Sequence, residues 1–281
     1  MALQLTYDYK ENVKQFEKEI ERTKKIHNRL LQDYNYVKNL GYNVFGIFLQ
    51  GSQNYLLDYE DSDIDTKCVV LPSAEEVILN KKPVSTTIVL EDNSHIDIKD
   101  IRLMWSCFKK QNINYLEILF TEFYFIPVEY LGYWEKMQDI REEIAHIDNY
   151  AAVNCLVGMV LEKNKALCHP YPTLKAKIEK YGYDNKQLHH IIRCSEFLDR
   201  YIEGTSFEEC LIPIDRDFLI GIKATYKYSL DQAKTLAADT VDYVKATKQA
   251  YLNSNERKIN EEVCTKLDTI LVQTLYGAWV F

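Results

Sequence analysis

The near-continuous apolar run from Val44 to Leu49 constrains the fold most, because such a run is typical of a central strand covered on both faces. It is followed by the pair Gly51-Ser52 and a polar loop. A second strand is predicted to begin with Asp63-Ile64-Asp65 and to continue to Leu71. The sequence therefore predicts two strands joined by a turn and a polar loop.

Asp63 and Asp65 are expected on one face of the second strand, with Ile64 directed towards the core, because side chains alternate along a strand. Two carboxylates this close repel each other, and a divalent cation such as Mg²⁺ between them offsets that cost. A lone Asp-x-Asp is also common at solvated strand edges. Gly51 and Ser52 add a second feature, since a glycine lets backbone N–H groups approach a phosphate and the serine hydroxyl is a further donor.

A third carboxylate, Asp97, lies in the segment from Ser94 to Lys99. Strand alternation directs Ile96 and Ile98 inward and Asp97 to the opposite face. If this strand pairs beside the Asp63–Asp65 strand, three carboxylates and the Gly-Ser turn converge on one site.

A second group of polar residues is predicted on a helix. Lys186, His190 and Arg193 are spaced i, i+4 and i+7, so one helical face carries all three donors, as a triphosphate or a nucleic-acid backbone requires. An ordinary solvated helix has the same appearance. The segment 163–193 contains seven basic and two acidic residues in a chain of net charge −8, which indicates a local polyanion site. His189 is expected either to point away from this face or to flank it, as a surface residue.

Two motifs carry a resemblance to a known family. Gly51-Ser52, Tyr55 and Asp61-Ser62-Asp63-Ile64-Asp65 resemble the Gly-Ser…Asp-x-Asp signature of the DNA polymerase β-like nucleotidyltransferase superfamily. The likeness is strongest to its bacterial and phage branch of predicted nucleotidyltransferases, with the motif GSRAYGLATPDSDYDVRG. The spacing from Gly51 to Asp65 is the same, and the chain departs from the motif at Gln53 and Leu56.

The same branch has a helix with the approximate pattern D-T-K-x-x-x-H-L-I-R. The residues that match this pattern are Asp184, Lys186, His190, Ile192 and Arg193. Together the two motifs span roughly residues 43 to 200.

The resemblance implies a nucleotidyltransferase that transfers a nucleoside monophosphate from a nucleoside triphosphate to an acceptor hydroxyl and releases pyrophosphate. Asp63, Asp65 and Asp97 are then the catalytic residues and the ligands of Mg²⁺ or Mn²⁺. The triphosphate is expected to bind Gly51, Ser52, Lys186, His190 and Arg193. An RNA or protein acceptor is expected at the basic 163–193 segment.

Two alternatives stay open. One is a non-catalytic nucleotide- or RNA-binding module of the same fold, and the other is an antitoxin-like transferase that modifies a protein hydroxyl. Three carboxylates without a metal are costly to keep close together, which favours the catalytic interpretation over the binding module. The sequence identifies neither the acceptor, nor the preferred base, nor the oligomeric state.

The remaining pattern predicts an α+β fold, in which a small mixed sheet with flanking helices is followed by an all-helical domain. We place the catalytic domain at 1–126 and the helical domain at 127–281. A helix is expected over residues 10–40, a short helix after Ser73, and a hairpin with strands at 84–90 and 94–99. The helices expected after residue 127 are 130–144, 150–167, 173–181, 185–202, 218–244 and 260–276.

Composition limits the remaining function classes. Hydrophobic residues make up 47% of the 281 residues, enough to fill substantial cores. The seven cysteines are scattered and form no Cys-x-x-Cys pair, which favours reduced thiols in a cytoplasmic protein. No apolar run approaches the ~20 residues of a membrane span, so no membrane partner is expected.

Overall fold

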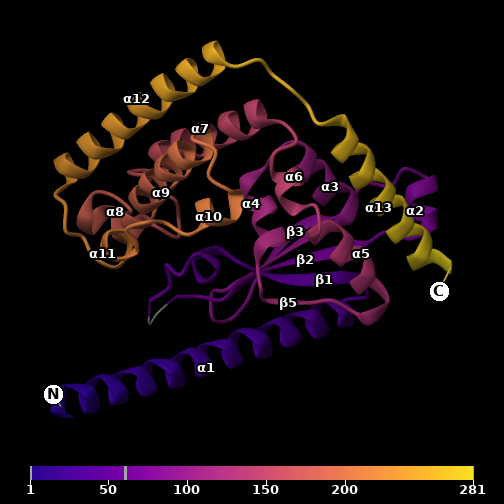
Figure 1. Ribbon diagram of the computed structural model, residues 1–281, viewed down its shortest axis with the longest axis horizontal. Coiled ribbons are helices and arrows are strands. Elements are labelled where there is room, and N and C mark those ends of the chain that lie inside the picture. Colours follow the sequence, from indigo (N-terminus) through magenta and orange to yellow (C-terminus); the bar gives the residue numbers. More distant parts are fainter. Residues whose placement is uncertain (1, 60–61, 281) are drawn as a thin grey trace.

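The computed structural model describes residues 2–59 and 62–280, which form a five-stranded mixed sheet and a large set of helices (Figure 1). The strand order is β3-β4-β2-β1-β5; β2 and β4 are parallel, and the other neighbours are antiparallel. The strands are β1 (Asn43–Gln50), β2 (Asp65–Leu71), β3 (Ser85–Val89), β4 (His95–Asp100) and β5 (Tyr124–Phe125). The predicted α+β class is confirmed.

Strand β1 is buried on both faces, as its sequence predicts. On one face it packs under helix α1 (Ala2–Asn39), through Ile26, Leu30 and Val37. The α1 helix ends before Gly41, whose φ of +91° favours glycine at this position. Figure 1 shows the N-terminal part of α1 extending well past the sheet.

The predicted hairpin is confirmed and delivers β4 to the centre of the sheet beside β2. Ile96 and Ile98 are fully buried, so Asp97 between them faces the other side of the sheet. Helix α2 (Ala74–Ile78) begins with the expected cap: the Ser73 side chain and Glu76 form a reciprocal capping box.

Helices cover the face of the sheet opposite α1 and continue beyond it. They are α3 (Ile101–Lys109), α4 (Ile113–Leu116), α5 (Val128–Gln138), α6 (Arg141–Ala145), α7 (Asn149–Ala166), α8 (Lys175–Tyr181), α9 (Asn185–Ile202), α10 (Phe207–Leu211), α11 (Arg216–Ala224), α12 (Leu230–Ser254) and α13 (Glu261–Val280). Two 3₁₀ helices, η1 (Gly51–Tyr55) and η2 (Glu117–Phe120), complete the list.

The expectation of one helix over 218–244 is wrong. The chain leaves α11 at Thr225 in an extended conformation, and α12 begins at a capping box between Ser229 and Gln232. The two-residue strand β5 and the short helix α10 were not predicted either. Both are too short to produce a periodic pattern.

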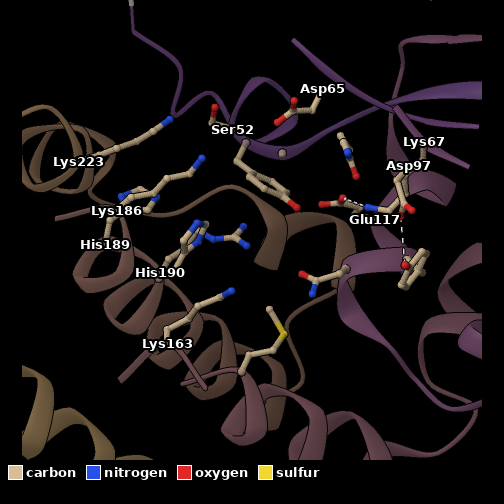
Figure 2. Close-up of a pocket in the computed structure, with 17 residues that line it drawn as sticks. Ser52, Asp65, Lys67, Asp97, Glu117, Lys163, Lys186, His189, His190 and Lys223 are labelled. Carbon is tan, nitrogen blue, oxygen red and sulfur yellow. Dashed lines mark hydrogen bonds and ion pairs between the residues drawn. The ribbon is translucent and has the colours of Figure 1, made fainter. Parts of the chain in front are cut away.

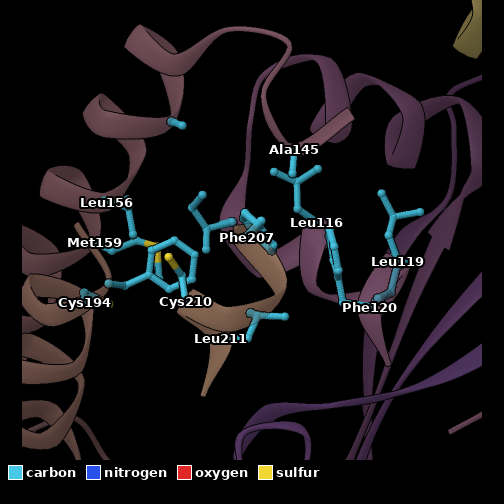
Figure 3. Packing of buried hydrophobic residues seen from close by; sticks show 14 of the residues in the cluster. Leu116, Leu119, Phe120, Ala145, Leu156, Met159, Cys194, Phe207, Cys210 and Leu211 are labelled. Carbon is cyan, nitrogen blue, oxygen red and sulfur yellow. The ribbon is translucent and has the colours of Figure 1, made fainter. Parts of the chain in front are cut away.

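One hydrophobic cluster contains residues from the sheet and from the helical region (Figure 3). Phe120 stacks on Phe207 with a centroid distance of 4.8 Å. Trp105 donates a 2.7 Å hydrogen bond from Nε1 to the carbonyl of Leu267 in α13. The two regions therefore share a core, and the division at 126/127 remains a prediction.

Within residues 2–59 and 62–280, no helix is both long enough and apolar enough to cross a bilayer.

Gly46 is the glycine that the sheet packing requires. An added Cβ would lie 2.9 Å from Cγ1 of Ile126 and 3.0 Å from Cζ of Phe48. We expect Gly46→Ala to lower the free energy of unfolding by about 1–3 kcal/mol, because a packed core accommodates extra volume poorly. Urea denaturation of the purified variant measures this change.

The matched control is Gly158→Ala in α7, where an added Cβ meets no described atom within 4 Å. That exchange should raise the free energy of unfolding by up to ~1 kcal/mol, because alanine has the higher helix propensity. Equal effects of the two substitutions would show that β1 is not packed as described.

Candidate active site

A cavity of about 360 Å³ lies between the end of the sheet and the helices α7, α9 and α11 (Figure 2). One wall is built by η1, β2, β4 and the segment from α4 to η2, and the other by the three helices. Its lining residues are Gln50, Gly51, Ser52, Tyr55, Asp65, Lys67, Asp97, Asn114, Tyr115, Glu117, Met159, Lys163, Lys186, His189, His190, Arg193 and Lys223.

Two of the three expected carboxylates line this cavity. Asp65 begins β2, and its Oδ1 accepts a 2.8 Å hydrogen bond from the backbone N–H of His95 and lies 3.3 Å from the Nδ1 of that residue. Asp97 pairs in register with Lys67, and its Oδ2 accepts a 3.1 Å hydrogen bond from the Tyr115 hydroxyl. The parallel pairing of β2 and β4 thus places both carboxylates on the same side of the sheet.

Asp63 occupies a different position from the one expected. Strand β2 begins at Asp65, so Asp63 precedes it, is exposed and is not among the cavity-lining residues. Its charge still raises the pKa of Lys223, one of the lining residues. Asp61 of the motif lies outside the described residues. Within the described part of the chain, no three His, Cys, Asp or Glu side chains are grouped closely enough to hold a metal ion.

A buried ion pair lies at the base of the cavity, and sequence reasoning missed it. Lys67 Nζ lies 2.8 Å from Oε1 of Glu117, and both side chains are about 5% exposed. Burial pushes the pKa of Lys67 down and that of Glu117 up, each to about 8. The charges of Asp97 and Asp65 oppose the shift of Lys67, and the charge of Arg193 opposes that of Glu117. The two-residue step from Asp65 to Lys67 signals that Lys67 shares its face, but nothing local indicates Glu117.

The Gly51-Ser52 turn is the first part of η1. Gly51 has a φ of +78°, a backbone conformation that side chains disfavour. Arg22 of α1 holds the turn from behind with a 2.7 Å hydrogen bond to the carbonyl of Gln53 and a second bond to its side chain. Gln53, where the family motif has arginine, is therefore engaged with α1, and the cavity side of the turn is left to Gly51 and Ser52.

The helical wall carries most of the positive charge. Lys186, His190 and Arg193 of α9 all line the cavity, on the face that their spacing predicts. Asp184 caps the start of α9 by accepting from the backbone N–H of Lys186. The guanidinium of Arg193 lies 4.0 Å from the ring centroid of Tyr55.

Two further lysines join this wall from other helices. Lys163 comes from α7 and is the first residue of the basic 163–193 segment, although no spacing connected it with the α9 residues. Lys223 comes from α11, and sequence reasoning missed it. Figure 2 shows the side chains of Lys163, Lys186 and Lys223 extending from the helices towards the sheet. Lys223 Nζ donates a 3.2 Å hydrogen bond to the carbonyl of Leu57.

The expectation that His189 is a surface residue is wrong. Its ring is 2% exposed, and Nδ1 lies 2.9 Å from the carbonyl of Leu219. Burial lowers the pKa of His189 to about 3. Burial also lowers the pKa of His190 well below its ordinary value, and the neighbouring His189, Arg193 and Lys186 add to that shift. Both rings are neutral at pH 7, so His190 offers one N–H donor but no charge.

The donor set fits a hard divalent cation bound together with a polyphosphate. Asp65 Oδ2 and Asp97 Oδ1 receive no hydrogen bond from the described residues, and Mg²⁺ binds one or two carboxylates plus substrate phosphates. The ammonium and guanidinium groups across the cavity match the charge of such a polyphosphate. A metal–triphosphate complex would therefore meet carboxylates on one wall of the cavity and cations on the other.

We expect the affinity of the cavity for anions to depend on pH, because the charge of Lys223 does. Burial, followed by repulsion from Lys186, lowers its pKa to about 8, and Asp58, Asp63 and Asp65 oppose that shift. The ammonium is therefore present at pH 7 and is lost as the pH rises through 8. We expect the affinity for inorganic tripolyphosphate to fall roughly tenfold between pH 7.5 and pH 9.5, because one charge-assisted contact disappears.

In Lys223→Arg the charge persists over this range, so the decrease measured by calorimetry should be clearly smaller. Lys165→Arg, on an exposed position of α7, is the control and should follow the parent. Identical pH profiles for all three proteins would exclude Lys223 from the anion site.

Comparison with known proteins adds little to this description. No family model matches the chain, and no curated protein matches it. Among solved structures, the chain is similar to a nucleotidyltransferase-like protein from Exiguobacterium sibiricum, with 14% sequence identity. The match covers 77% of this chain and 73% of that protein, with a TM-score of 0.30.

Proposed function

We propose that the protein is a metal-dependent nucleotidyltransferase. The observation that supports this most directly is the opposition of Asp65 and Asp97 to Lys163, Lys186 and Lys223 across one cavity. A non-catalytic anion-binding site has no need for two carboxylates facing the anion, because they weaken its binding. A metal–triphosphate complex uses both walls.

The transfer we propose breaks a phosphoanhydride bond and forms a phosphate ester. The oxygen of an acceptor hydroxyl bonds to the α-phosphorus of a nucleoside triphosphate, and the bond between that phosphorus and the bridging oxygen of the β-phosphate breaks. Pyrophosphate leaves, and the acceptor proton passes to a base. When bound, the metal would neutralise the phosphate oxygens and lower the pKa of the acceptor hydroxyl.

The residues of the chain have separate roles in this proposal. Asp65 and Asp97 would hold Mg²⁺ or Mn²⁺, with Asp63 as a further ligand from outside the cavity lining, and Asp97 would accept the proton. Gly51 and Ser52 contact the β- and γ-phosphates through N–H and O–H donors.

The helical wall completes the phosphate site. Lys186 and Arg193 neutralise the triphosphate, joined by Lys163 and Lys223, and His190 donates one hydrogen bond. Arg193 is 7% exposed, and its Nε is a buried donor to which the described residues offer no acceptor. A phosphate oxygen or an ordered water would satisfy it. An acceptor, RNA or protein, would approach along the basic 163–193 segment.

Asp97 separates catalysis from binding. We expect Asp97→Ala to retain substantial binding of Mg²⁺ and nucleoside triphosphate through Asp65, but to lose transfer by about 10²- to 10⁴-fold, because the proton acceptor is removed. Asp65→Asn should lose transfer as well. The assay supplies each α-labelled nucleoside triphosphate with Mg²⁺ or Mn²⁺ and either total RNA or cell extract.

Asp239→Asn, an exposed carboxylate of α12, is the matched control and should transfer like the parent. If the parent binds nucleotide but transfers none to any acceptor, the protein is a binding module. Transfer to proteins alone would identify the antitoxin-like alternative.

Two lysines of α7, one inside the cavity and one outside it, test the contribution of the helical wall to triphosphate binding. Lys163 lines the cavity, whereas Lys165 lies two residues further along α7 and is exposed. We expect Lys163→Ala to weaken triphosphate binding roughly tenfold at low ionic strength, because a cationic contact in a half-buried site is lost. Lys165→Ala should change it less than twofold. Equal losses in a direct binding titration would show that only the net charge of the segment matters.

A further inference from the structure

A strip of aromatic rings and lysines leads away from the mouth of the cavity. We define this aromatic–lysine strip as Tyr59, Lys223, Tyr226, Tyr181 and Lys180. Lys223 lines the cavity, and its Nζ lies 5.0 Å from the ring centroid of Tyr59. Three residues later, beyond the end of α11, Tyr226 stacks on Tyr181 with a centroid distance of 3.6 Å and an interplanar angle of 9°. Lys180 Nζ lies 4.7 Å from the ring centroid of Tyr181.

The strip is available to a partner. Tyr59 and Tyr181 are each 37% exposed, so part of each side chain is in contact with solvent. Tyr181 is the last residue of helix α8. The three lysines of this helix, at positions 175, 177 and 180, are exposed, and Glu179 is its one acidic residue. The surface next to the cavity therefore combines partly exposed aromatic side chains with positive charge.

From this juxtaposition we propose that the aromatic–lysine strip binds a single-stranded nucleic acid whose terminal sugar hydroxyl enters the cavity as the acceptor. The inference rests on the proposed function, because it names the acceptor of that transfer. Single strands offer unstacked bases to aromatic rings and phosphates to lysines, the two kinds of group that the strip combines. A duplex presents its phosphates but hides its base faces.

The strip fits a protein acceptor less well. An acidic peptide would pair with the lysines but would make no use of the exposed ring faces. The chemistry of transfer is unchanged: the sugar hydroxyl oxygen bonds to the α-phosphorus, pyrophosphate leaves, and the proton passes to Asp97.

Fluorescence anisotropy with labelled ten-residue oligouridylate and oligothymidylate tests the strip on the full chain. We expect both strands to bind more tightly than a duplex of equal length, with an affinity that falls as salt rises. A preference for the uridylate would assign the acceptor to RNA, and a preference for the thymidylate would assign it to DNA. Tyr181→Ala should weaken binding by roughly 5- to 100-fold, because a stacking contact with a base is lost. Lys180→Gln should reduce the slope of log affinity against log salt concentration by about one, because one phosphate contact is lost.

The matched controls are Tyr36→Ala, a similarly exposed tyrosine on α1, and Lys82→Gln, an exposed lysine before β3. Both should bind the strands like the parent. If Tyr181→Ala binds like Tyr36→Ala, or if duplex binds as tightly as single strands, the inference is overturned.

Measurements of tripolyphosphate and nucleotide binding distinguish failure of this inference from failure of the proposed function. Tyr181 does not line the cavity, so Tyr181→Ala should bind tripolyphosphate as the parent does. Normal nucleotide transfer to proteins without any binding of single strands would overturn the inference and leave the transferase intact. Failure to bind nucleotide would overturn the transferase, while the anisotropy titration would still decide the strip.

Discussion

The burial of strand β1 on both faces is the constraint on which the rest of the structure depends. Helix α1 covers one face, and the cluster shared with the helical region covers the other. Because no polar side chain can be accommodated along the middle of β1, its polar groups appear only where it ends, at Gln50 and the Gly51-Ser52 turn. Arg22 then fixes that turn from the α1 side, so the cover of the strand also positions the candidate phosphate contacts.

Carboxylates line the sheet side of the cavity and cations line the helical side, a separation that the packing of the fold does not require. The sheet contributes Asp65 and Asp97, and three helices contribute Lys163, Lys186, Arg193 and Lys223. Lys67 offsets part of the repulsion between Asp65 and Asp97, whereas the helical wall contributes no acidic residue to the described lining. The cations of the helical wall therefore repel one another. A ligand that carries both a cation and a polyanion relieves the repulsion on each wall.

The Lys67–Glu117 ion pair marks the boundary between these walls. Lys67 is surrounded by the carboxylates of Asp65 and Asp97, yet its direct partner is Glu117, which also feels the charge of Arg193. Removing either partner would leave an uncompensated buried charge, which is costly. The pair therefore ties β2 to η2 and keeps the floor of the cavity closed beneath the candidate metal ligands.

The sequence by itself determined the features that repeat along one element. The apolar run fixed β1, alternation placed Ile96 and Ile98 inward and Asp97 outward, and the i, i+4, i+7 spacing placed Lys186, His190 and Arg193 on one face of α9. The break between α11 and α12 was also present in the sequence, as the capping box at Ser229, but the continuing apolar period obscured it.

Only the tertiary structure decided which elements meet. The parallel pairing of β2 with β4 brings Asp97 beside Lys67. Because β2 begins at Asp65, Asp63 lies outside the cavity lining. The packing of α11 on α9 buries His189. Glu117, Lys163 and Lys223 reach the cavity from segments far apart in the chain. Local periodicity fixes the side of an element on which a residue lies, but the partner of that side is chosen by long-range packing, which leaves no pattern near the residue itself.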